Sequence, residues 1–180
     1  VPDLVDIQAV VDPAVTSTDR SDSHGISIGG IDANGITYVL WSWEGISTPD
    51  ASIRLAIRKG MHYKATQVTI ETDQGGDLWE ESYYRVAEDF GKNTGPYQAT
   101  RIPAFHGERA GSIGSKIHRA NMLLQAYKRG EVVHVRNDES THLLLEKGLR
   151  RFPIRKPFDL VDSQFWLWYM LTQAGMPGFY

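Results

Sequence analysis

The sequence of 180 residues contains no cysteine, which excludes disulfides, zinc–thiolate sites and thiol nucleophiles. No apolar run is long enough to cross a membrane, so no membrane partner is expected. The sequence also lacks a Gly-x-x-x-x-Gly-Lys-Ser/Thr phosphate loop and a His-Glu-x-x-His pair, which argues against ATP hydrolysis and against that type of zinc site. The chain begins with Val1 rather than Met, and we expect it to be part of a longer protein.

What is present is typical of a globular protein: 41% hydrophobic and 23% charged residues, enough for a single domain over residues 1–180. The net charge of −3 argues against a protein that simply coats DNA. The charge is unevenly spread, however. Residues 1–100 carry 7 Lys/Arg against 15 Asp/Glu (−8), and residues 101–156 carry 12 against 5 (+7). This asymmetry is typical either of solvated helix faces or of an acidic centre beside a basic track for a polyanion.

The pattern of apolar residues predicts a mixed sheet that opens with an antiparallel β-meander and is flanked by helices. Asn34-Gly35 between two β-rich runs is a strong hairpin signal. The expected strands are 4–12, 25–31, 36–43, 66–71, 97–105 and 131–136, and the expected helices are 48–60, 77–90, 116–128, 139–151 and 159–173.

Four acidic residues stand at the ends of these predicted buried elements. Asp12 closes the first strand, Glu71 closes a later one, and Asp159 and Asp162 open the last helix. Carboxylates beside a core are costly unless positive charge compensates them, so their convergence predicts a divalent-cation site of oxygen ligands. An acid in the first strand of a meander, one after a later strand and one in a late helix form the arrangement of ribonuclease H-like nucleases, which use two metal ions.

Each acid also has a simpler interpretation. Asp12 could cap the loop that follows it, and the two helical aspartates could merely oppose the helix dipole. Glu71 is harder to explain in this way, because neither turns nor caps favour Glu there. Trp41, Trp43, Trp166 and Trp168 are expected to pack in the core rather than to stack on bases.

An ordered series of short motifs resembles the C-terminal nuclease domain of the large terminase subunit of tailed phages, the DNA-packaging motor. The matching segments span nearly the whole chain: 11–14, 24–30, 38–40, 70–77, 116–120, 130–134 and 158–163.

The resemblance implies that Asp12, Glu71 and Asp162 are the metal-binding, catalytic carboxylates, and that Asp159 is an additional ligand. The family often has Asn two residues after the strand-end Glu, whereas this chain has Asp73, so Asp73 is a further candidate ligand. The implied cofactors are two Mg²⁺ or Mn²⁺ ions. The implied activity is endonucleolytic cleavage of double-stranded DNA with low sequence specificity during phage genome packaging, in the host cell cytoplasm.

Basic residues near the helix at 116–128 are candidates for contact with the DNA backbone. Arg109, Lys116 and Arg119 are the expected DNA-binding residues, although a solvated helix face would look the same. The track could extend through Arg150, Arg151, Arg155 and Lys156. By resemblance the protein partners are an upstream ATPase domain, a portal and a small terminase subunit.

Two other classes of function fit the same residues. Another ribonuclease H-like nuclease, such as a junction resolvase or a transposase-like enzyme, needs the same acids with a different DNA surface. A docking module for DNA or for a portal would retain the acids without cutting. An actin-like phosphotransferase is disfavoured, because no glycine-rich phosphate loop follows Asp12.

Overall fold

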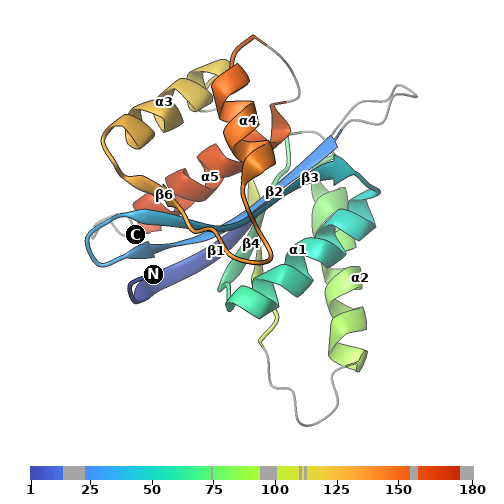
Figure 1. Ribbon diagram of the computed structural model, residues 1–180. Helices are drawn as coiled ribbons and strands as arrows, with labels where there is room; N and C mark the ends of the chain where they lie inside the picture. Colours follow the sequence, from blue (N-terminus) through green and yellow to red (C-terminus); the bar gives the residue numbers. More distant parts are fainter. Residues whose placement is uncertain are drawn as a thin grey trace.

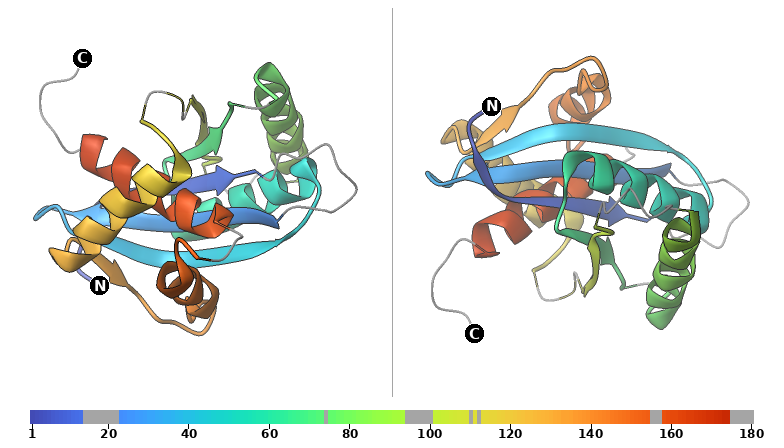
Figure 2. Two further views of the ribbon diagram at one scale, coloured as in Figure 1. Left: turned by 90° about the horizontal axis from the view of Figure 1, so that it is seen from above. Right: turned by 90° about the horizontal axis from the view of Figure 1, so that it is seen from below.

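The structure is a computed structural model that describes residues 1–13, 23–73, 75–93, 101–109, 111, 113–154 and 158–174. Six strands form one mixed sheet, and helices cover both of its faces (Figures 1 and 2). The strands are β1 (Leu4–Asp12), β2 (Ser23–Asp32), β3 (Thr37–Ile46), β4 (Gln67–Glu71), β5 (Ala104–Glu108) and β6 (Val132–His134). The helices are α1 (Pro49–Tyr63), α2 (Asp77–Asn93), α3 (Lys116–Lys128), α4 (Leu143–Arg151) and α5 (Asp159–Ala174).

The strand order across the sheet is β5-β4-β1-β2-β3-β6. The first three strands pair antiparallel, as the sequence predicted, and the outer pairs β1–β4, β4–β5 and β3–β6 are parallel. The hairpin between β2 and β3 turns at Asn34-Gly35, where Gly35 has a φ of +82° and the Asp32 carboxylate accepts the backbone N–H of Asn34. Because β1 lies in the middle of the sheet, its last residue is placed next to residues from both sides.

Alternate residues of the central strands build one hydrophobic core on each face of the sheet. Val10 faces the core formed with α3, α4 and α5, whereas Ala9 and Val11 face the core formed with α1 and α2. Helix α5 is apolar nearly all round, which suits a helix that packs on the sheet and under α3 and α4. Trp41, Trp166 and Trp168 are buried and Trp43 is partly buried, which agrees with the predicted core packing.

Two predicted elements begin well after their expected starts, and local chemistry explains each, whereas the other predicted ends differ from the structure by at most about three residues. The strand expected at 97–105 lies at Ala104–Glu108, because Pro103 has no N–H to donate and the ladder with β4 begins only after it. Residues 94–100 lie outside the described part of the chain. The helix expected from residue 139 begins at Leu143, because the Asn137 side chain accepts the backbone N–H groups of Glu139 and Ser140 in a turn.

Among the described residues, no helix is both long enough and apolar enough to cross a membrane.

Candidate metal centre

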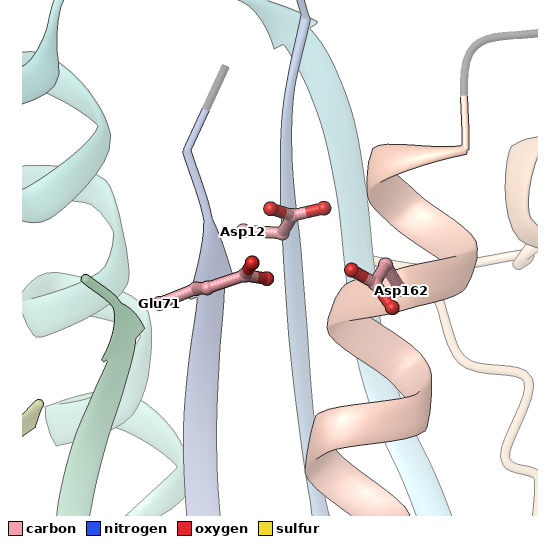
Figure 3. A group of neighbouring side chains, drawn as sticks. All are labelled: Asp12, Glu71 and Asp162. Atoms are coloured by element: carbon pink, nitrogen blue, oxygen red, sulfur yellow. The ribbon is translucent and has the colours of Figure 1, made fainter. Parts of the chain in front are cut away.

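Three carboxylates come together where the central strands end (Figure 3). Strands β1 and β4 run parallel as neighbours, with Val11 opposite Ile70, so the residues that follow these two, Asp12 and Glu71, emerge side by side. Helix α5 lies against β1 and β2 and supplies Asp162 from its first turn. Figure 3 shows the three side chains pointing toward one another from the two strands and the helix.

The close approach of α5 depends on Gly25 of β2, which is the residue paired with Asp12 in the sheet. A Cβ placed on Gly25 would clash with the backbone carbonyl of Asp159 and would lie 2.6 Å from the backbone nitrogen of Leu160. Only glycine therefore lets the first turn of α5 rest on β2 at this point. This contact places Asp162 beside Asp12.

The carboxylates are close and largely shielded from water. One oxygen from each of Asp12, Glu71 and Asp162 lies within 4.8 Å of the others. The side chains of Asp12 and Asp162 are 2% and 1% exposed, and that of Glu71 is 13% exposed. Two buried acids and one partly buried acid at this separation repel one another strongly unless cations lie beside them.

Lys116, the first residue of α3, supplies one of these cations. Its Nζ donates hydrogen bonds to Asp12 Oδ2 at 2.7 Å and to Asp159 Oδ1 at 3.0 Å, and lies 3.6 Å from Asp162 Oδ2. The lysine side chain is 36% exposed, so it reaches the carboxylates from the solvent side of the site.

Arg119, one turn further along α3, supplies the other cation from within the protein. Its guanidinium grips Asp162 with two hydrogen bonds, of 2.8 Å from Nε and 2.5 Å from Nη2, and a third bond goes to the carbonyl of Gly114. Nη2 also lies 3.7 Å from Glu71 Oε2. The bidentate pair fixes the orientation of the Asp162 carboxylate.

Burial and crowding alter the proton affinities of the site. Burial raises the pKa of Asp12 well above its usual range, since the opposing charge of Lys116 is offset by Asp162, Glu71 and Asp159. Burial and Asp162 likewise raise the pKa of Glu71. For Lys116, burial lowers the pKa, but the charges of Asp12, Asp162 and Asp159 outweigh it and the net pKa is raised. The ammonium therefore stays charged.

These residues fit a divalent cation. Carboxylate oxygens from three separate elements are the ligand set that Mg²⁺ and Mn²⁺ prefer. The position of Lys116 Nζ, bonded to two acids and close to a third, shows that the cluster is built around positive charge. Within the described residues, no other group of three potential ligand side chains converges in this way.

The remaining predicted ligands lie outside this triad. Asp159 borders it, where its carboxylate accepts Lys116 Nζ and, at 3.4 Å, the Ser23 hydroxyl. Asp73 is exposed and is not one of the converging residues.

The basic residues predicted to bind DNA occupy different positions. Arg109 is exposed directly after β5, which pairs with β4 so that Glu108 lies opposite Glu71. Lys116 points into the carboxylates, and Arg119 is 3% exposed and bound to Asp162. A direct contact of Arg119 with DNA phosphate thus finds little support in its burial, and its predicted DNA role stays untested. Arg155 and Lys156 lie outside the described residues.

Sequence reasoning missed the contribution of Trp166. Its Nε1 donates to Glu71 Oε2 at 3.2 Å, and its ring lies beneath the Arg119 guanidinium at 5.3 Å. The indole thereby orients one proposed ligand and supports the cation that orients another. The signal was available, because Trp166 follows Asp162 by four positions and so shares its helix face.

Comparison with known proteins places this arrangement in a fold family. No protein-family model matches the chain, and no curated protein matches its sequence. The nuclease domain of human cytomegalovirus terminase is similar in structure, with a TM-score of 0.62 and 12% identity over 91% of this chain and 82% of that one. The chain has a ribonuclease H-like, terminase nuclease-like fold.

Two further solved structures agree with this ribonuclease H-like fold. The nuclease domain of the large terminase subunit gp2 of bacterial virus Sf6 has a TM-score of 0.57 and 11% identity, over 91% of this chain and 87% of that one. The yeast mitochondrial Holliday junction resolvase Ydc2 has a TM-score of 0.56 and 12% identity, over 93% of this chain and 80% of that one. The fold predicted from the sequence is confirmed.

Proposed function

We propose that this domain is a metal-dependent endonuclease that cleaves double-stranded DNA during phage genome packaging. The convergence of Asp12, Glu71 and Asp162 within 4.8 Å, at the end of the central strands, is the observation that carries the proposal. The similarity to terminase nuclease domains supports it, and one of those, from Sf6, was solved with manganese. The ATPase domain, portal and small terminase subunit are proposed partners on the same basis.

Asp12, Glu71 and Asp162 would hold the metal, with Asp159 at the border of the site. When bound there, one or two Mg²⁺ or Mn²⁺ ions would activate a water and stabilise the oxygen that leaves phosphorus. Trp166 and Arg119 hold the carboxylates of Glu71 and Asp162 in place, so the ligand geometry is set before metal or DNA arrives. Low sequence specificity is expected, because contacts with phosphates carry no information about the bases.

Cleavage of supercoiled plasmid tests this proposal. Wild-type protein should nick or linearise the plasmid with Mn²⁺ or Mg²⁺ but not with EDTA, and Asp12→Asn and Glu71→Gln should lose at least about a hundredfold in rate. These two changes keep the shape of each side chain, whereas a change at Asp162 would deprive the buried Arg119 of its bidentate partner and would threaten the fold.

Asp138→Asn is the matched control, because it removes one exposed carboxylate away from the triad. Equal cleavage by the wild type and both site variants would contradict the proposed centre. Binding of DNA without any metal-stimulated cleavage would favour the docking module.

The similarity to the yeast resolvase supports a second candidate, a nuclease for branched DNA. The two candidates differ in substrate. A resolvase should cut a four-way junction in preference to a linear duplex of the same length, whereas a packaging nuclease should cut both at similar rates.

A further inference from the structure

The exposed side of α4 carries a concentration of positive charge that the metal centre does not use. Leu143, Glu146, Lys147, Arg150 and Arg151 line an open hollow of about 350 Å³. The side chains of Lys147, Arg150 and Arg151 are exposed, and none of the three forms an ion pair with another described residue. We call these three residues the α4 basic cluster.

Several other exposed arginines of the described chain are neutralised by an acid. Arg54 pairs with Asp89 at 2.7 Å, Arg85 with Asp50 at 2.7 Å, and Arg129 with Glu131. The one acid in the hollow, Glu146, is held by Arg136 at 3.1 Å and by His134 at 3.2 Å. Counting Arg136, Lys147, Arg150 and Arg151 against Glu146 leaves a local balance of +3 on a chain whose net charge is −3.

The α4 basic cluster is tied to the metal centre through α5. A Cβ on Gly148 of α4 would lie 3.1 Å from Val161, which is the residue before Asp162. The rings of Phe152 and Phe158, which follow α4 and precede α5, lie 5.2 Å apart and hold the end of one helix near the start of the other. Figure 1 shows α4 beside α5 on the face of the sheet that also carries α3.

We propose that the α4 basic cluster is a docking surface for the phosphate backbone of a DNA duplex whose scissile strand lies at the metal centre. This inference rests on the proposed function for its choice of DNA as the polyanion. A duplex presents closely spaced negative charges, and three unpaired cations on one helix face can contact successive phosphates. The exposed Leu143 beside them adds apolar contact area without any base recognition.

Salt dependence of binding provides the test. A fluorescent duplex of mixed sequence is titrated with the protein in EDTA, so that no cleavage occurs, at several salt concentrations. Changing Lys147, Arg150 and Arg151 together to Gln should weaken binding at least about tenfold and reduce the slope of log K against log salt by about 2 to 3.

The matched control changes Arg54, Arg58 and Arg85 to Gln. It removes the same charge from α1 and α2, on the other face of the sheet, at the cost of exposed ion pairs that contribute little stability. The control should bind like the wild type. Equal weakening of DNA binding in both triple variants would show that only net charge matters and would overturn the proposal. An α4 variant that binds DNA as tightly as the wild type would also overturn it, as would a wild-type protein that does not bind the duplex.

Plasmid cleavage, measured separately on the same proteins, distinguishes failure of this inference from failure of the proposed function. If the wild type cleaves the plasmid with metal and the α4 variant binds DNA as tightly as the wild type, only the docking surface is contradicted. If the α4 variant binds DNA more weakly but the wild type does not cleave the plasmid, the docking surface is supported and the nuclease function is contradicted.

Discussion

Lys116 holds its ammonium group where the carboxylates of Asp12, Asp159 and Asp162 meet. Without a counter-charge, two buried and one partly buried carboxylate would repel one another. The lysine stem is partly exposed and flexible, so the ammonium can leave when a stronger cation enters. If a metal binds these carboxylates as proposed, Lys116 would stabilise the metal-free site and would compete with the metal for the same oxygens.

Replacing Lys116 with Met should have opposite effects with and without metal. Without divalent cations the variant should lose about 1–3 kcal/mol of stability, because charged carboxylates lose their hydrogen-bond donor. With saturating Mn²⁺ the melting temperature should rise more than it does in the wild type. Thermal unfolding with and without Mn²⁺ checks this, with the exposed Lys128→Met as control. An equal Mn²⁺-induced rise in melting temperature in the wild type and in Lys116→Met would contradict competition between Lys116 and the metal.

Single residues differ in how much of their role the sequence reveals. Asp12, Glu71 and Asp162 could be selected because each acid ends or begins a buried element. The inward position of Lys116 could not be predicted in this way, because the sequence does not fix where a long, flexible side chain points. Arg119 was expected at the surface and is buried instead, since only the folded chain brings Asp162 to it.

At the scale of elements, the docking of α5 on β2 decides whether the acids meet. The helix and the strand touch at Gly25, opposite Asp12 in the sheet, and a side chain there would collide with the backbone of α5. The site therefore depends on a residue that contributes no ligand.

Gly25→Ala should lower stability by about 1–3 kcal/mol through overpacking and should weaken the Mn²⁺-induced rise in melting temperature. Gly111→Ala is the matched control, because a Cβ at Gly111 meets open space. Urea unfolding and thermal shift measure the two effects. A Gly25 variant with wild-type stability and wild-type response to Mn²⁺ would show that the close contact is dispensable.

A second junction joins β6 and α4 through the partly buried His134 and the buried His142. Burial lowers the pKa of both His134 and His142. The His142 Nε2–H donates to the carbonyl of Val135 at 2.9 Å, and Nδ1 lies 2.9 Å from the Ser42 hydroxyl, so both ring nitrogens have a hydrogen-bond partner. A histidine whose pKa is lower in the folded than in the unfolded chain binds fewer protons when folded. Its contribution to the free energy of unfolding therefore falls as the pH drops below about 6.5.

His142→Gln should therefore be less stable than the wild type at pH 8, with a difference that shrinks by up to about 1.4 kcal/mol per pH unit as the pH falls below about 6.5. Urea unfolding of both proteins across this range measures the difference. A gap that does not change with pH would contradict a neutral, buried His142.

Element types were predicted well, because hydrophobic periodicity and the Asn34-Gly35 turn act locally. The helix expected at 116–128 has those bounds in the structure, and the strand expected at 4–12 does as well. The predicted starts of β5 and α4 were wrong because of single residues. Pro103 has no backbone N–H for the sheet ladder, and the Asn137 side chain accepts backbone N–H groups in a turn before the helix.

For the whole molecule, the mixed sheet was predictable but its strand order was not. The parallel pairing of β4 with β1 and of β6 with β3 joins segments far apart in the sequence, and no local signal encodes it. That pairing creates the site by ending β1 and β4 side by side. It also leaves two elements of the acidic centre, β1 and α5, in the same core as α4, which carries the α4 basic cluster.

Binding of Mn²⁺ in solution, followed by isothermal titration calorimetry, tests the central claim most directly. The wild type should bind one or two ions, and Asp12→Asn and Glu71→Gln should each lower the affinity at least about tenfold, while Asp138→Asn should not. Circular dichroism verifies the fold of each variant. Equal Mn²⁺ affinity in the wild type and both site variants would contradict the metal centre.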